Sequence, residues 1–197
     1  MNKKLGKTIT KEEVSQYPAE AFCGRIAEIR TTGECEEAVT YLSGYNMLGF
    51  DTETRPTFKK GNVNGAALIQ LSTHDSCYLF RLNIIGFPSS LIHLLSNPDI
   101  QKIGLSLRDD FHSMGRRLKF TPQGFVDLQN VVKNYDIDEL SLQKIYALIF
   151  QKKISKSQRL TNWEADFLTE SQKRYAALDA WACLKIYEEL CLIKKSI

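Results

Sequence analysis

The stretch 48–56, Leu-Gly-Phe-Asp-Thr-Glu-Thr-Arg-Pro, constrains the fold of this chain more than any other. Apolar residues lead into two carboxylates, Asp51 and Glu53, and Pro56 then stops regular structure. Alternate residues of a strand share a face, so we expect both carboxylates to project together while Thr52 points to the other side. Two ionised carboxylates this close repel each other unless a proton or a cation joins them. The pattern predicts a buried strand that ends in a magnesium or manganese site, although a strand end with two solvated acids explains this triplet alone at least as well.

Composition places the chain among ordinary globular proteins. A length of 197 residues with 43% hydrophobic and 25% charged residues is enough for one buried core. The net charge of +3 permits an anionic partner without demanding one. Five cysteines without a C-x-x-C pair argue against a disulfide framework or a zinc site and favour a reducing cytoplasm. We expect a cytoplasmic protein with no signal peptide or membrane span, in which a polar lead-in over 1–21 precedes a single domain over 22–197.

Hydrophobic periodicity predicts an α/β domain around one mixed sheet. Polar turn residues between two apolar runs indicate a hairpin over 66–82. Strands are expected at 47–51, 66–71, 77–82, 102–105 and 124–127, with a less regular candidate at 22–30. Helices are expected at 34–42, 89–95, 110–118, 142–150 and 169–193, and the chain reads as helical from Ser141 onward apart from a lysine-rich connector at 151–156.

Two further acidic elements follow the first one along the chain. Asp109 and Asp110 come at a loop-to-helix junction after a strand, where an aspartate most often serves as an N-cap. Tyr175 and Asp179 lie four residues apart in the last helix and therefore address the same point. A packed tyrosine beside a solvated aspartate explains the second pair equally well.

In this order the three elements resemble the RNase D-like and Werner-type exonuclease domains, the tyrosine-bearing (DEDDy) subgroup of the DEDD 3′-5′ exonuclease superfamily. The first motif of that family is present at 50–56, and the third, Y-x-x-x-D, at 175–179. Counting from the preceding glycine places the second-motif aspartate at Asp110, with Asp109 as the neighbouring alternative. The flanking runs 157–163 and 168–180 also resemble the family, whereas Asp166-Phe167 stands where a proline is common. The resemblance covers about residues 22–192.

The resemblance implies a ribonuclease H-like fold, a five-stranded mixed sheet with three antiparallel strands followed by parallel ones, flanked by helices. It implies a metal-dependent 3′-5′ exonuclease that uses two divalent ions, Mg²⁺ or Mn²⁺, and releases nucleoside 5′-monophosphates from DNA or RNA with a free 3′ end. By resemblance, Asp51 bridges the ions, Glu53 and Asp179 hold the water-activating ion, and Asp110 supports the second. Tyr175 would orient the attacking water.

Substrate contacts are less constrained by the sequence. Basic residues near the third motif are candidates for phosphate contacts or for solvated surface: Lys152, Lys153, Lys156, Arg159, Lys173 and Arg174. Arg55 is expected to line the cleft, and Arg116, Arg117 and Lys119 to be surface. Phe50 and Trp163 are expected to be core residues. Two other functions stay open, a non-catalytic nucleic-acid-binding module on the same fold and a different phosphoesterase such as an endonuclease. The sequence indicates no protein partner and does not separate DNA from RNA.

Overall fold

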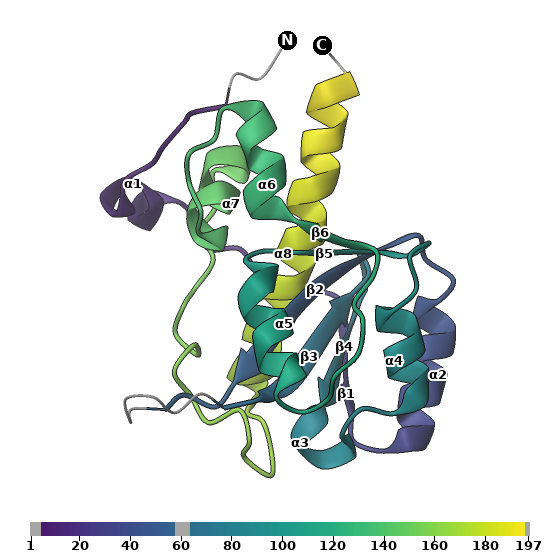
Figure 1. Ribbon diagram of the computed structural model, residues 1–197. Helices are drawn as coiled ribbons and strands as arrows, with labels where there is room; N and C mark the ends of the chain where they lie inside the picture. Colours follow the sequence, from purple (N-terminus) through teal and green to yellow (C-terminus); the bar gives the residue numbers. More distant parts are fainter. Residues whose placement is uncertain (1–4, 58–63, 196–197) are drawn as a thin grey trace.

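A computed structural model of the protein describes residues 5–57 and 64–195 and contains one six-stranded mixed sheet with helices on both faces (Figure 1). The strand order is β1-β4-β3-β2-β5-β6. The strands are β1 (Arg25–Ile29), β2 (Met47–Thr54), β3 (Ala66–Ser72), β4 (Ser76–Arg81), β5 (Gln101–Gly104) and β6 (Phe125–Asp127). Strands β2, β3 and β4 pair antiparallel, as expected, and the remaining pairs are parallel.

The expected number of five strands is wrong for the described residues, because β1 adds a sixth. This strand is the irregular candidate at 22–30, and it pairs in parallel with β4 along its whole length, from Arg25 opposite Ser76 to Ile29 opposite Phe80. The pairing covers the outer edge of β4, whose backbone groups would otherwise be unpaired.

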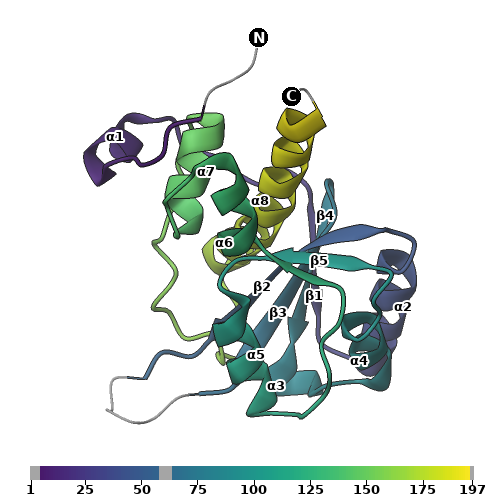
Figure 2. The same cartoon turned by 45° about the horizontal axis from the view of Figure 1, so that its top comes forward.

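The helices lie in two layers (Figures 1 and 2). The long last helix packs along one face of the sheet, and α5 packs on β2 and β3 while α2 and α4 lie side by side. The helices are α1 (Lys11–Gln16), α2 (Thr32–Leu42), α3 (Leu82–Ile85), α4 (Ser89–Leu95), α5 (Leu107–Gly115), α6 (Leu128–Val131), the 3-10 turn η1 (Val132–Tyr135), α7 (Leu142–Phe150) and α8 (Glu170–Lys195). No helix in the described ranges combines the length and apolarity needed to cross a membrane.

Alternation along the strands divides the core into two apolar clusters. On β3, Leu68 belongs to the cluster under α8 and its neighbour Ile69 to the cluster under α2, α4 and α5. On β2, Phe50 is fully buried in the second cluster, as expected. Burial of a side chain of this size contributes about 1.5–3 kcal/mol, so Phe50 helps to hold the second cluster against β2.

Helix α5 begins three residues earlier than expected, at Leu107, so Asp110 lies in its first turn and not at a loop-to-helix junction. The cause is distant in sequence. The Asp127 carboxylate, at the end of β6, accepts hydrogen bonds from the amides of Ser106 (3.1 Å) and Leu107 (3.0 Å). These bonds satisfy backbone donors at the helix start, which a local pattern does not reveal.

The lysine-rich connector expected at 151–156 is present, but the chain stays irregular beyond it to Thr169, so it is not otherwise helical from Ser141 onward; we name residues 151–169 the connecting segment. Helix α7 ends at Phe150, the following residue Gln151 has the left-handed conformation (φ 53°), and the chain then runs irregularly to α8. Its Trp163 is fully buried, as expected. Helix α8 begins as predicted, because the amide of Gln172 donates to the Thr169 hydroxyl (3.2 Å) and the Gln172 side chain accepts from the Thr169 amide (3.0 Å).

The described part of the lead-in, residues 5–21, packs against the domain. Helix α1 lies beside α7. The buried Ile9 donates its amide to the Glu139 carboxylate at 3.0 Å. The lead-in is therefore ordered by contacts with the helical layer.

Candidate active site

Three carboxylates meet where α8 crosses β2. Asp51 and Glu53 project from β2 toward α8, and Asp179 projects from α8, with one oxygen of each carboxylate within 4.8 Å of the others. A Cβ atom at Gly49 would lie 2.0 Å from the carbonyl oxygen of Ala180. The absence of a side chain at Gly49 therefore lets the backbone of α8 rest on β2 and brings Asp179 over the two strand carboxylates.

Asp110 reaches the same region from α5. Thr52 points away from Asp51 and Glu53, as expected, and its hydroxyl donates a hydrogen bond to Asp110. Asp110 is 8% exposed, whereas Asp109 is exposed and accepts from the Ser106 hydroxyl at 3.3 Å. Of the two aspartates, the structure brings Asp110 to the carboxylate group.

Burial and mutual repulsion make the ionised cluster unfavourable. Burial, followed by repulsion from Asp110, raises the pKa of Asp51 well above its usual range. Burial and then repulsion from Asp179 raise the pKa of Glu53 in the same way. Burial also raises the pKa of Asp110 and that of Asp179 to about 7 each. At neutral pH the group therefore favours taking up protons or a cation.

Two buried polar groups beside the cluster lack partners among the described residues. One is the Oδ1 atom of Asp179, and the other is the fully buried side-chain amide of Gln70, which pairs in register with Asp51 on the neighbouring strand. An unpaired buried polar group costs about 1–3 kcal/mol. A hard divalent cation fits this donor set, because it takes carboxylate oxygens and neutralises their charge.

Tyr175 lies one helical turn before Asp179 and donates a hydrogen bond to it. Burial, followed by the negative charge of Asp179, raises the pKa of the Tyr175 hydroxyl far above its usual range, so the hydroxyl stays protonated. The Tyr175 ring packs beside that of Trp163, with ring centroids 6.1 Å apart. The hydrogen bond between Tyr175 and Asp179 confirms the sequence prediction that these two side chains address one point.

The cluster opens into a hollow of about 560 Å³. Its walls come from the end of β2, the first turns of α5 and the connecting segment: Thr52, Glu53, Thr54, Pro56, Thr57, Asp109, Asp110, His112, Ser113, Arg159 and Leu160. Attraction to Arg159 opposes the rise in the Glu53 pKa. Leu160 is 68% exposed and offers an apolar surface at the same opening.

The basic residues near the third motif divide into two groups. Lys152 pairs with Glu20 (3.0 Å), Lys153 donates to the carbonyl of Ser15 (2.7 Å), and Lys173 pairs with Glu28 (3.3 Å). These three lysines are therefore already engaged in contacts within the protein. By contrast, Arg159 lines the hollow, Lys156 attracts Asp179 electrostatically, and Arg174 lines a smaller cavity beside Tyr175.

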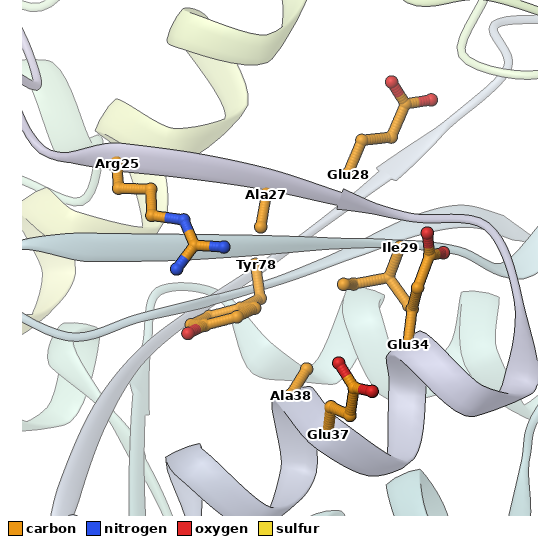
Figure 3. A pocket seen from close by; sticks show the side chains of 8 residues that line it. All are labelled: Arg25, Ala27, Glu28, Ile29, Glu34, Glu37, Ala38 and Tyr78. Carbon is orange, nitrogen blue, oxygen red and sulfur yellow. The ribbon is translucent and has the colours of Figure 1, made fainter.

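A second hollow, of about 310 Å³, lies between β1 and α2 on another part of the molecule (Figure 3). Figure 3 shows Glu34 and Glu37 on α2 facing the strand, with Glu28 directed to the other side. The Glu34 carboxylate already accepts from the amides of Arg30 (2.8 Å) and Thr31 (2.9 Å) at the start of α2. None of the predicted site residues lines this hollow, so it is separate from the carboxylate cluster.

Sequence reasoning missed the parts played by Gly49, Thr52 and Asp127. Gly49 is a glycine inside a strand, which is a recognised signal of close backbone approach. Asp127 ends a strand next to β5, so it meets the start of α5, but this position follows only from the sheet order. Thr52 gives no signal of its own until α5 is placed.

Comparisons with known proteins show the family of this chain. A family profile of 3′-5′ exonucleases matches residues 26–193. The chain is 35% identical over 179 residues to the bifunctional 3′-5′ exonuclease/ATP-dependent helicase WRN of Mus musculus, covering 86% of this chain and 13% of that protein. It is 32% identical over 193 residues to a 3′-5′ exonuclease of Arabidopsis thaliana, covering 88% of this chain and 66% of that protein.

Solved structures resemble the fold. The Nibbler EXO domain of Aedes aegypti superposes with a TM-score of 0.80 at 23% identity, over 90% of this chain and 94% of that one. Escherichia coli RNase D, an exoribonuclease, superposes with a TM-score of 0.76 at 23% identity, over 87% of this chain and 46% of that one. The likeness concerns the arrangement of the sheet and its helices.

Proposed function

Because this chain belongs to the 3′-5′ exonuclease family, we propose that it hydrolyses phosphodiester bonds at the 3′ end of DNA or RNA in a divalent-metal-dependent reaction. The ribonuclease H-like fold expected from the sequence is confirmed by the structures it resembles. One observation carries the proposal, the convergence of Asp51, Glu53 and Asp179 with a buried carboxylate oxygen that has no protein partner in the described part of the chain.

The four acids would divide between two ions, Mg²⁺ or Mn²⁺. Asp51, Glu53 and Asp179 form the compact group that would hold the first, and Asp110, close to Asp51, would support the second. When bound, such ions supply an activated water and stabilise charge on the departing 3′ oxygen. The raised pKa values of the acids favour this occupancy, because a cation replaces the protons that the empty cluster tends to hold.

The other side chains of the site would orient the reactants. Tyr175 keeps its proton and is therefore suited to hold the attacking water by a hydrogen bond and not to act as the base. Thr52 fixes the Asp110 carboxylate. Arg159 provides positive charge at the hollow for a phosphate, and Leu160 provides an apolar contact for a base. The product of this reaction would be a nucleoside 5′-monophosphate.

Digestion of 5′-labelled single-stranded DNA and RNA, each alone and annealed, tests the proposal. With Mg²⁺ or Mn²⁺ we expect a ladder that shortens from the 3′ end, and we expect chelator and Asp51→Ala to abolish it. If the folded protein binds these strands but cleaves none of them, it is a binding module on the same fold. Cleavage at internal positions would instead indicate an endonuclease.

A matched pair of variants tests the second-motif residue. Asp110→Asn should lower turnover by about a hundredfold or more, since it removes a buried acid from the cluster, whereas Asp109→Asn should leave turnover nearly unchanged. Equal tolerance of both changes would contradict the assignment of Asp110.

A further inference from the structure

Three segments that wall the hollow are joined at its rim by one carboxylate. Glu164 of the connecting segment pairs through Oε1 with Arg117 (2.9 Å) and through Oε2 with Arg55 (3.6 Å). Arg55 follows β2 and lies between Thr54 and Pro56 of the hollow, and Arg117 comes just after α5. The end of β2, α5 and the connecting segment lie close together in both views (Figures 1 and 2).

Contacts that do not involve Glu164 place both arginines. The Asn64 side chain donates to the backbone carbonyl of Arg55 at 2.7 Å. The Arg117 side chain lies across Gly65, where a Cβ atom would come within 2.8 Å of the Arg117 Cγ. The side chain of Arg117 is 27% exposed and that of Arg55 55% exposed. Both guanidinium groups therefore meet at the Glu164 carboxylate beside the hollow and are partly accessible to a ligand there.

The backbone around Glu164 is held by other residues. Arg81, which is fully buried, donates to the carbonyl of Ala165, and Arg30 donates to that of Asp166 at 2.7 Å. Asn83 donates to the carbonyl of Glu164 itself at 3.4 Å. Partly exposed ion pairs contribute little to stability. The Glu164 carboxylate can therefore leave the two arginines without releasing the connecting segment.

We propose that Arg55 and Arg117 form a phosphate site for the polynucleotide backbone on the 5′ side of the nucleotide being removed, and that Glu164 occupies this site in the free protein. The guanidinium group matches carboxylates and phosphates in the same fork-like geometry, so a backbone phosphate can replace the Glu164 carboxylate. A strand whose 3′ end lies in the hollow leaves it over this rim. The proposal rests on the proposed function for the direction of the strand.

The test compares substitutions that remove a positive charge, at Arg55 or Arg117, with one that removes the negative charge of Glu164. In an Asp51→Asn background, which keeps the strand intact, the affinity for a long single-stranded oligonucleotide is measured by fluorescence anisotropy with Mg²⁺. Arg55→Gln and Arg117→Gln should each weaken binding about two- to fivefold, and Glu164→Gln should tighten it by a similar factor. Each arginine substitution should also lower the slope of log affinity against log salt by about 0.7. Lys119→Gln, which removes the same charge nearby, should change neither quantity comparably.

Chain length separates this site from the reacting end. In the otherwise unmodified enzyme, the arginine substitutions should raise KM for the long oligonucleotide and leave KM and kcat for a dinucleotide unchanged. If Glu164→Gln weakens binding in the same direction as Arg117→Gln, the ion pairs only fasten the segment, and the phosphate site is refuted. Equal effects on the dinucleotide would also refute it. If the unmodified protein neither binds nor degrades any strand, the proposed function fails instead.

Discussion

Replacing Asp179 with asparagine should stabilise the metal-free protein while destroying its activity. Asp179 is 9% exposed, lies within the compact carboxylate group and has one oxygen without a hydrogen-bond partner in the described residues. Its ionised form is therefore unfavourable in the absence of a cation. Asparagine has nearly the same shape and carries no charge.

The size of the effect follows from the pKa of Asp179, which burial raises from 3.8 to about 7. Because the folded state holds this proton more tightly than the unfolded state, stability falls as pH rises between about 4 and 7. Relative to low pH, where Asp179 is protonated in both states, a shift of this size lowers the free energy of unfolding by roughly 4 kcal/mol at pH 8 and by roughly 2 kcal/mol at pH 5. Burying an unpaired amide costs about 2 kcal/mol at either pH. Asp179→Asn should therefore raise the free energy of unfolding of the metal-free protein by about 2 kcal/mol at pH 8, which corresponds to about 4–8 °C in Tm. At pH 5 the change should be near zero.

Thermal unfolding in chelator, followed by circular dichroism at both pH values, measures this gain. Asp109→Asn is the control, since it removes an exposed acid of the same charge beside Asp110, and its Tm should match that of the parent protein. Added Mn²⁺ should raise the Tm of the parent protein and have much less effect on Asp179→Asn. If Asp179→Asn is no more stable than the parent at pH 8 in chelator, the cluster is not strained and the case for a cation loses its main support.

Three further substitutions test how the site is built. Tyr175→Phe should lower kcat by about a hundredfold with little change in KM, because only the orienting hydroxyl is lost. Retained stabilisation of the variant by Mn²⁺ would show that the acids are intact. An unchanged kcat would exclude a role of the hydroxyl in orienting the attacking water. Gly49→Ala should destabilise the protein by about 1–3 kcal/mol in urea unfolding and weaken Mn²⁺ binding, since it pushes α8 away from β2. Gly115→Ala is the control and should do neither, because a Cβ atom at Gly115 meets nothing within 4 Å. Arg81→Leu should cost about 1–3 kcal/mol and speed hydrogen exchange in the connecting segment, because it removes the donor to the Ala165 carbonyl and one of the cationic partners of Glu28. Unchanged exchange would mean that other contacts hold the segment.

Local signals predicted the parts of the fold that depend on neighbouring residues. The apolar run ending in Asp51 and Glu53 predicted a buried strand with both acids on one face, and both acids do face α8. The start of α8 was predicted from Thr169, and it depends on bonds within three residues. Such bonds are readable because both partners lie in one short stretch of sequence.

The features that could not be predicted depend on contacts with residues far away in the sequence. The sixth strand depends on β4, about 50 residues later, for its pairing. The lysines that were candidates for phosphate contacts or solvated surface were indistinguishable in sequence, yet Lys152 is paired with Glu20, before β1, and Lys173 with Glu28 on β1. Arg117, expected to be surface, is paired with Glu164, 47 residues away in the sequence.

The acids of the cluster that do not lie on β2 come from two helices, α8 and α5, that differ in how extensively they pack on the sheet. Helix α8 carries both Asp179 and Tyr175, has 26 residues and packs on β2, β3, β4 and β5. Helix α5 carries Asp110, has nine residues and depends at its start on the Asp127 carboxylate. A cation held by Asp51, Glu53 and Asp179 would therefore meet a preformed set of ligands, whereas the position of Asp110 can adjust as α5 moves. Repulsion between Asp110 and Asp51 favours such movement in the metal-free protein, so the α5 side of the site is where we expect binding of the second ion to be coupled to structure.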